Sequence, residues 1–308
     1  MTVPTLAAST ANAPNRSWAF LGPVEALPLL VAIVWGGSYS AAKIATEQVP
    51  VLQFLLLRFG LTFLLLLPAL RGLAVAAWPS ALAGASLLGA NLLAIFVCET
   101  FGVSLTTASN AAFLISLCVA FTPLCEWWLL KVRPTAGVLA ASALSLLGAG
   151  LLAFQHGVSV SALAWGDALM VVAAFLRGVM VCLTRRQGLR HGLPALTVTA
   201  VQMGVMTLGS GLLMIAVQGA VWTPLPSSAS FWGAMAFLVL LCTLLAFFVQ
   251  NYAASRTSPS RVALLMGSEP LWGALIAVVW IGDRLTLQGW LGGLLIVASA
   301  WWVTRPRA

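Results

Sequence analysis

The chain has 308 residues, of which 61% are hydrophobic and only 7% are charged, and its mean hydropathy is +1.03. A soluble domain carries roughly 25% charged residues, so the composition excludes a soluble fold and indicates an all-α integral membrane protein. The formal net charge of +8 would suggest a nucleic-acid partner in a soluble protein. In a membrane protein its meaning depends on where the basic residues lie.

Apolar segments long enough to cross a bilayer follow a polar N-terminal tail at 1–26. A spanning helix needs about 20 largely apolar residues, and charged residues, Pro and Gly mark the ends of such segments. The spacing predicts ten transmembrane helices, at 27–46, 51–70, 79–102, 107–130, 135–154, 166–184, 195–217, 231–254, 262–281 and 286–304. A short tail at 305–308 ends the chain.

The basic residues gather in alternate connections between these segments. With a cytoplasmic N-terminus, eleven of the 15 fall on the cytoplasmic side: Arg16, Arg71, Lys131, Arg133, Arg185, Arg186, Arg190, Arg256, Arg261, Arg305 and Arg307. Lys43 and Arg284 fall near the opposite face, and Arg58 and Arg177 lie within spans. Cytoplasmic loops are enriched in Lys and Arg, so we expect both termini in the cytoplasm and a location in the plasma membrane, the inner membrane of a bacterium.

The two halves of the chain resemble each other. A shift of 151 residues places Leu93–Val97 on Leu244–Phe248, and the match continues downstream. We therefore expect two five-helix repeats, at 27–157 and 158–304. Because five is odd, the second repeat would enter the membrane in the opposite direction, and inverted repeats are typical of alternating-access transporters.

Several short tracts carry a family resemblance. They are 106–114 through Pro123, 258–264, 268–270, 282–286 and the Trp-Gly-Gly-Ser sequence at 35–38. Over about residues 27–304 they resemble the ten-helix EamA-type exporters of the drug/metabolite transporter superfamily. Members usually have Glu at the position that Asp283 occupies here. The resemblance implies export of amino acids, related metabolites or drugs, and it does not name the substrate.

Charged and polar side chains lie near the middle of several predicted spans. They include Arg58, Arg177, Glu269, Asn91 and Gln202. A charged side chain at the bilayer centre costs roughly 2.5 to 3.5 kcal/mol on insertion scales, so these groups should face the interior of the bundle. We expect them to surround a central polar cavity.

Arg177 is the candidate for binding a substrate, because a guanidinium group offers a planar fork to a carboxylate. This would suit an anionic or zwitterionic substrate. The alternative is that Arg177 pairs with Glu269 or Glu99 and only holds helices together. Arg58 resembles an Arg that is common in the second helix of the family, and for it we favour a structural role.

Two acidic residues and two prolines are candidates for coupling and gating. Glu269 or Glu99 could carry a coupling proton, and Glu99 could instead bind an ammonium group. The alternatives without a transport function are a helix-packing ion pair for Glu269 and a wetted, inert position for Glu99. Glu99 aligns with Gln250 in the repeat, so one half has an ionisable group where the other has an amide. Pro270 and Pro123 interrupt helical hydrogen bonding, which makes both candidate hinges.

Two tryptophans, Trp35 and Trp272, lie near mid-span rather than at the interfaces. They could stack on the apolar part of a substrate, with Ser38 and Tyr39 supplying hydrogen bonds. Helix packing is the alternative for both rings.

No catalytic or metal-binding pattern is present in the sequence. The five cysteines form no CxxC pair, and the two histidines, His156 and His191, fall in predicted loops on opposite faces. No Gly-rich stretch ends in Gly-Lys-Ser/Thr, so we expect no cofactor and no ATP hydrolysis. These patterns favour a transporter over an intramembrane enzyme.

The leading hypothesis is a secondary transporter that exports a small metabolite, most simply an amino acid or a related zwitterionic or amphipathic compound. A flippase for lipids or lipid-linked sugars is the first alternative, and an intramembrane enzyme is the second. The expected partners are a small-molecule substrate, the lipid bilayer and, as an open option, protons. We expect no nucleic acid, and either a monomer or a homodimer.

Overall fold

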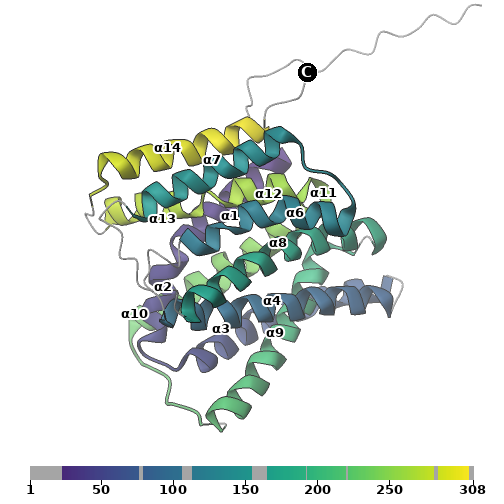
Figure 1. Ribbon diagram of the computed structural model, residues 1–308. Helices are drawn as coiled ribbons and strands as arrows, with labels where there is room; N and C mark the ends of the chain where they lie inside the picture. Colours follow the sequence, from purple (N-terminus) through teal and green to yellow (C-terminus); the bar gives the residue numbers. More distant parts are fainter. Residues whose placement is uncertain are drawn as a thin grey trace, which may run out of the picture.

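The computed structural model describes residues 23–75, 79–105, 113–154, 165–191, 193–219, 221–280 and 284–304. All regular structure in these ranges is helical, and none of them contains a strand (Figure 1). The all-α prediction is therefore confirmed. The tails at 1–22 and 305–308 lie outside the described residues.

Helices cover most of each predicted apolar segment within the described residues, but a turn divides segment 27–46 at Gly37 and segment 262–281 at 267–268. The first half of the chain contains α1 (Pro23–Gly36), α2 (Ser38–Thr46), α3 (Val51–Leu66), the 3-10 helix η1 (Leu67–Val75), α4 (Ser80–Leu105), a short stretch at 113–116, α6 (Cys118–Leu130) and α7 (Ala136–Ala153). The second half contains α8 (Trp165–His191), α9 (Ala195–Gln218), α10 (Ala229–Phe237), the π-helix η2 (Leu238–Leu245), α11 (Ala246–Arg256), α12 (Pro259–Met266), α13 (Glu269–Trp280) and α14 (Leu287–Thr304).

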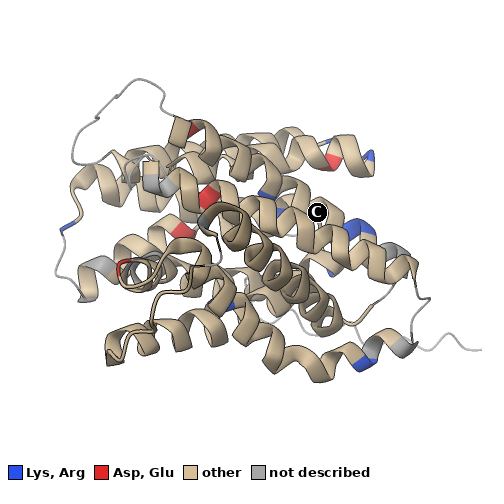
Figure 2. Ribbon diagram, turned by 90° about the horizontal axis from the view of Figure 1, so that it is seen from below, with Lys and Arg blue, Asp and Glu red and all other residues tan. Residues whose placement is uncertain are grey.

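Among the described residues, seven helical stretches are long and apolar enough to cross a membrane. They are Val51–Arg71, Ser80–Gly102, Phe113–Leu130, Ala136–Ala153, Trp165–Gly188, Ala195–Val217 and Ala229–Arg256. Two further apolar helices, Ala26–Gly36 and Leu287–Trp302, are shorter. Figure 2 shows how sparse the charged residues are along these helices. The chain is thus a multi-pass membrane protein, and the count of ten spans stays a prediction.

Side-chain caps explain where several helices begin. Thr135 accepts a hydrogen bond from the backbone N–H of Val138 at the start of α7. Ser228 accepts one from the backbone N–H of Phe231 at the start of α10. Ser258 caps α12, whose first residue is Pro259. The first turn of a helix has N–H groups without partners inside the helix, so Ser and Thr stabilise it and Pro is tolerated there.

Glycine pairs allow the closest helix crossings. A Cβ atom on Gly148 of α7 would lie 2.6 Å from the carbonyl oxygen of Gly292 in α14, and one on Gly36 of α1 would lie 2.7 Å from the backbone nitrogen of Gly273 in α13. Figure 1 shows α7 and α14 side by side along one face of the bundle. Only glycine permits this approach, as expected for small residues at interfaces between membrane helices.

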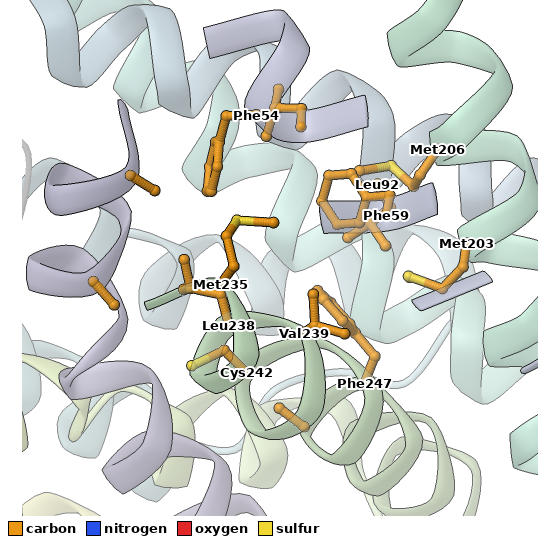
Figure 3. Close-up of a cluster of buried hydrophobic side chains, with 14 of the residues drawn as sticks. Phe54, Phe59, Leu92, Met203, Met206, Met235, Leu238, Val239, Cys242 and Phe247 are labelled. Atoms are coloured by element: carbon orange, nitrogen blue, oxygen red, sulfur yellow. The ribbon is translucent and has the colours of Figure 1, made fainter. Parts of the chain in front are cut away.

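The largest apolar cluster lies where α3, α4 and α9 meet the α10–η2–α11 segment. Figure 3 shows Phe59 and Met206 on one side of this cluster and Met235, Leu238 and Phe247 on the other. All five side chains are 2% exposed or less. This packed layer supports the neighbouring Trp35 and Arg58, which belong to the site described next.

Candidate functional site

Three charged side chains from three helices meet inside the bundle. Nη2 of Arg177, on α8, donates hydrogen bonds to both carboxylate oxygens of Glu99, on α4, at 3.0 and 2.9 Å. Nη1 of Arg177 lies 3.4 Å from Oε2 of Glu269, the first residue of α13. The exposed fractions of the three side chains are 20%, 12% and 9%. The cluster is mostly shielded from solvent.

Among the described residues, the cluster contains one cation and two carboxylates. Ion pairs of this kind are stronger than neutral hydrogen bonds, but burying three charges also has a large desolvation cost. The structure shows that Arg177 pairs with both acidic partners, which is the arrangement expected if these residues hold helices together. A substrate carboxylate would compete with Glu99 and Glu269 for the two Nη groups of Arg177.

Trp35 connects this cluster to the π-helix η2. Its indole N–H donates to the carbonyl oxygen of Cys242 over 2.8 Å. The guanidinium carbon of Arg177 lies 5.5 Å from the centroid of the Trp35 ring, a cation–π contact. The ring of Phe247 packs against the Trp35 ring at an interplanar angle of 60°, with centroids 5.4 Å apart. The indole is thus fixed by Cys242 and Phe247, and its ring contacts the guanidinium group of Arg177.

Trp272 lies on α13 at the crossing with α1. Its indole N–H donates to Oγ of Ser268 at 3.2 Å, one turn earlier. The backbone of Trp272 packs directly against Gly36, next to Trp35. Ser38 is half-buried at the start of α2, and the side chain of Tyr39 lies outside the described residues.

Arg58 is a second buried guanidinium, and its surroundings differ. Only 5% of the residue is exposed. Its Nε donates to Oγ1 of Thr243 at 2.8 Å, and that hydroxyl donates to the carbonyl oxygen of Leu238 inside η2. The guanidinium carbon lies 5.5 Å from the ring centroid of Phe59 and 5.4 Å from that of Phe96. Two phenyl rings take the place that carboxylates have around Arg177.

A row of aromatic rings joins the two guanidinium groups. From Arg58 it runs through Phe96 to Phe247, with ring centroids 6.2 Å apart, and then to Trp35 beside Arg177. Phe96 and Phe247 are equivalent under the 151-residue shift, so the row crosses between the two repeats. Sequence reasoning missed both phenylalanines as site residues, although their equivalence in the repeat was a usable signal.

The two remaining predicted cavity residues, Asn91 and Gln202, make interhelical hydrogen bonds. Nδ2 of Asn91 donates to the carbonyl oxygen of Leu176, the residue before Arg177, at 3.1 Å. Gln202 is fully buried, and its Oε1 accepts a hydrogen bond from Nδ2 of Asn251 at 2.7 Å. Asn91 thus anchors α4 to the turn of α8 that carries Arg177, while Gln202 joins α9 to α11.

The two predicted hinge prolines lie at irregular points of their helices. Pro123 lies inside α6 and has no backbone N–H to donate to the carbonyl oxygen of Val119, one turn earlier. That oxygen instead accepts a hydrogen bond of 3.2 Å from Oγ of Ser142 in α7. Pro270 is the second residue of α13, after a turn that separates α13 from α12. The expected break at Pro270 is therefore present, and a hinge motion at either proline stays a prediction.

A small hollow is present at the bundle end where α4 and α9 begin. It is lined by Ala81, Ala85, Leu88, Thr184, Gln187, Gly188, Leu193, Ala195, Val198, Asn251 and Ser255. None of the predicted substrate-binding residues lines this hollow. The expected polar cavity around Arg177 stays a prediction.

Comparisons with known proteins agree with this architecture. The EamA-like transporter family model matches residues 23–154 and 164–305. An uncharacterized transporter of Archaeoglobus fulgidus is 25% identical over 280 residues, which cover 89% of this chain and 95% of the relative. A probable terminal-alkyne amino-acid exporter of Streptantibioticus cattleyicolor is 25% identical over 287 residues, covering 90% and 92%. A crystal structure with 19% identity has a TM-score of 0.74 and covers 91% of this chain and 96% of its own, so it shares the fold.

Proposed function

The chain belongs to the EamA-like transporter family, and from this premise we propose that it is a secondary transporter exporting a small zwitterionic or amphipathic metabolite. An amino acid is the simplest such substrate. The proposal places the protein in the plasma membrane with both termini in the cytoplasm, as the distribution of Lys and Arg favours. Alternating access of two inverted repeats would move the substrate past the charged cluster. One relative named as a probable amino-acid exporter supports this choice of substrate.

The observation that carries the proposal is the buried triad of Arg177, Glu99 and Glu269. Removing one partner from a buried ion pair costs roughly 3 to 5 kcal/mol, so a simple anion that displaced a carboxylate would leave that carboxylate unpaired. A zwitterion brings its own ammonium group for the displaced carboxylate. The triad therefore favours a substrate that carries both charges.

The two carboxylates also provide for proton coupling. Protonation of Glu99 or Glu269 would weaken its bond to Arg177 and remove the excess negative charge of the triad. Release of the proton on the other side of the membrane would restore the pairing. Under this proposal, transport depends on a proton gradient, and one of these two residues is the carrier.

The test is flux into liposomes that contain the purified full-length protein. Radiolabelled neutral amino acids would be followed with and without an imposed proton gradient, and fluorescent phospholipid analogues would be followed in the same vesicles. Saturable, gradient-stimulated amino-acid flux without lipid movement is the expected result. Lipid movement without amino-acid flux would refute the proposal and support a flippase.

A further inference from the structure

We propose that Arg58 is the receptor for the carboxylate of the substrate, and that this substrate is an α-amino acid with an apolar or aromatic side chain. The inference rests on the proposed transport function and assigns a binding role to a group that sequence reasoning interpreted as structural. It also gives Arg58 and Arg177 separate tasks.

Arg58 is a buried guanidinium group that has no carboxylate partner among the described residues. Within the described ranges it forms no salt bridge, and its one hydrogen bond is the bond from Nε to Thr243. A guanidinium group carries more N–H donors than this bond uses. Arg58 is 5% exposed and lies within the apolar stretch Val51–Arg71. A charge kept at such depth is expected to meet its counter-ion during function.

The surroundings of Arg58 match the parts of an apolar amino acid. The planar fork of the guanidinium suits a carboxylate. Glu99 follows Phe96, whose ring contacts Arg58, by one turn of α4 on the same face of the helix. It can therefore receive an ammonium group. The rings of Phe96, Phe247 and Trp35 lie alongside and can pack against an apolar side chain.

The charge count inside the bundle agrees with this assignment. Arg58, Arg177, Glu99 and Glu269 together contain two cations and two carboxylates, yet both carboxylates contact Arg177. A zwitterion adds one charge of each sign. Three pairs can then form: Arg58 with the substrate carboxylate, Glu99 with its ammonium group, and Arg177 with Glu269. None of these charges is left without a partner, whereas a substrate with a single charge would leave one.

The competing explanation is that Arg58 only stabilises the fold. Its bond to Thr243 supports the π-helix η2, and its contacts with Phe59 and Phe96 resemble a clamp. If Arg58 has only this structural role, its replacement should affect the binding of charged and uncharged forms of a substrate equally. A carboxylate receptor should distinguish an amino acid from its amide, which has the same shape and the same ammonium group.

The experiment uses the full-length protein with L-phenylalanine and L-phenylalaninamide as probes. Apparent affinities come from ligand-induced thermal stabilisation of the wild type and of the variants Arg58→Gln and Arg58→Lys. The control is Arg71→Gln, which replaces an exposed arginine of the same apolar stretch. We expect Arg58→Gln to weaken phenylalanine binding at least about tenfold while leaving amide binding unchanged. Arg58→Lys should fall between the two, and Arg71→Gln should match the wild type.

A second measurement needs no variant. Phenylglyoxal, which modifies arginine, is applied to the wild type, and the label on Arg58 is quantified by mass spectrometry with each probe present. Protection by phenylalanine but not by the amide supports the assignment. Equal loss of both affinities in Arg58→Gln, or equal protection by both probes, assigns Arg58 to the fold. If the wild type neither binds nor transports any amino acid, the transport proposal itself fails, which is a different outcome.

Discussion

The two buried arginines of this protein show how differently one side chain can be accommodated inside a membrane bundle. Arg177 lies between two carboxylates from other helices. Arg58 lies between two phenyl rings and donates to a hydroxyl group. The carboxylates around Arg177 neutralise its charge, whereas the phenyl rings around Arg58 shield its charge from lipid without neutralising it. The role of a buried arginine therefore depends on the groups that contact it and not on its depth in the membrane.

The largest effect on stability is expected from Arg177→Ala, which tests the difference between the two arginines. The substitution leaves Glu99 and Glu269 side by side without their cation, so we expect a loss of roughly 3 to 5 kcal/mol of stability. The measurement is thermal unfolding in detergent, with Arg58→Ala as the matched variant, which should be less destabilised. Adding Glu99→Gln to Arg177→Ala should restore part of the loss. Equal destabilisation by both arginine variants would contradict the distinction.

A smaller effect is expected from Gly36→Ala, which disturbs the Arg177 region and leaves the contacts of Arg58 in place. The added methyl group would lie 2.7 Å from the backbone nitrogen of Gly273 and would force α1 away from α13. Overpacking of this kind costs about 1 to 3 kcal/mol. Gly233→Ala is the control, because a Cβ atom there meets nothing within 4 Å. Unfolding temperatures that agree between the two variants would show that the close crossing is not required.

Glu99→Gln should separate binding from stability. Arg177 keeps Glu269 as a partner, so we expect a loss of only about 1 to 2 kcal/mol in thermal unfolding. In the flux assay the variant should lose its preference for phenylalanine over the deaminated acid, 3-phenylpropionate, because the receptor for the ammonium group is gone. Glu47→Gln, on an exposed side chain after α2, is the control. An unchanged preference would remove Glu99 from the site.

The smallest effect is expected from Trp35→Phe, which keeps an aromatic ring beside Arg177 and removes the indole N–H. The lost hydrogen bond to Cys242 should cost about 0.5 to 1.5 kcal/mol. Trp272→Phe is the matched variant, because its indole bonds within its own helix, to Ser268. Trp35→Phe should lower the unfolding temperature more. The reverse order would mean that the tie between α1 and η2 is not important.

Much of the site could be predicted from the sequence, because the energetic cost of charge in a membrane applies to any arrangement of the helices. That cost singled out Arg58, Arg177 and Glu269 and directed them to the bundle interior, whereas Glu99 was singled out by its alignment with Gln250 in the repeat. It could not say which of the two arginines receives the carboxylates. Glu99 and Glu269 lie 78 and 92 positions from Arg177, and only helix packing decides whether groups so far apart meet.

Other contacts were out of reach for the same reason. Glu126 precedes two tryptophans in the sequence, yet it is buried and accepts hydrogen bonds from the backbone N–H and the hydroxyl of Ser260 at the start of α12. Its position next to two tryptophans favoured the interface. The cap of a distant helix leaves no local pattern in the sequence.

The sequence by itself determined the class of the protein. Long apolar segments cannot remain in water, their basic flanks favour one orientation, and the duplicated pattern places equivalent residues in both halves. Only the tertiary structure decided which side chains become neighbours. It brought Phe96 onto Phe247 and two carboxylates onto Arg177, and it left Arg58 among aromatic rings. The physical reason is that hydropathy acts on each segment separately, whereas ion pairs and ring contacts depend on distances of a few ångströms between helices that are remote in the chain.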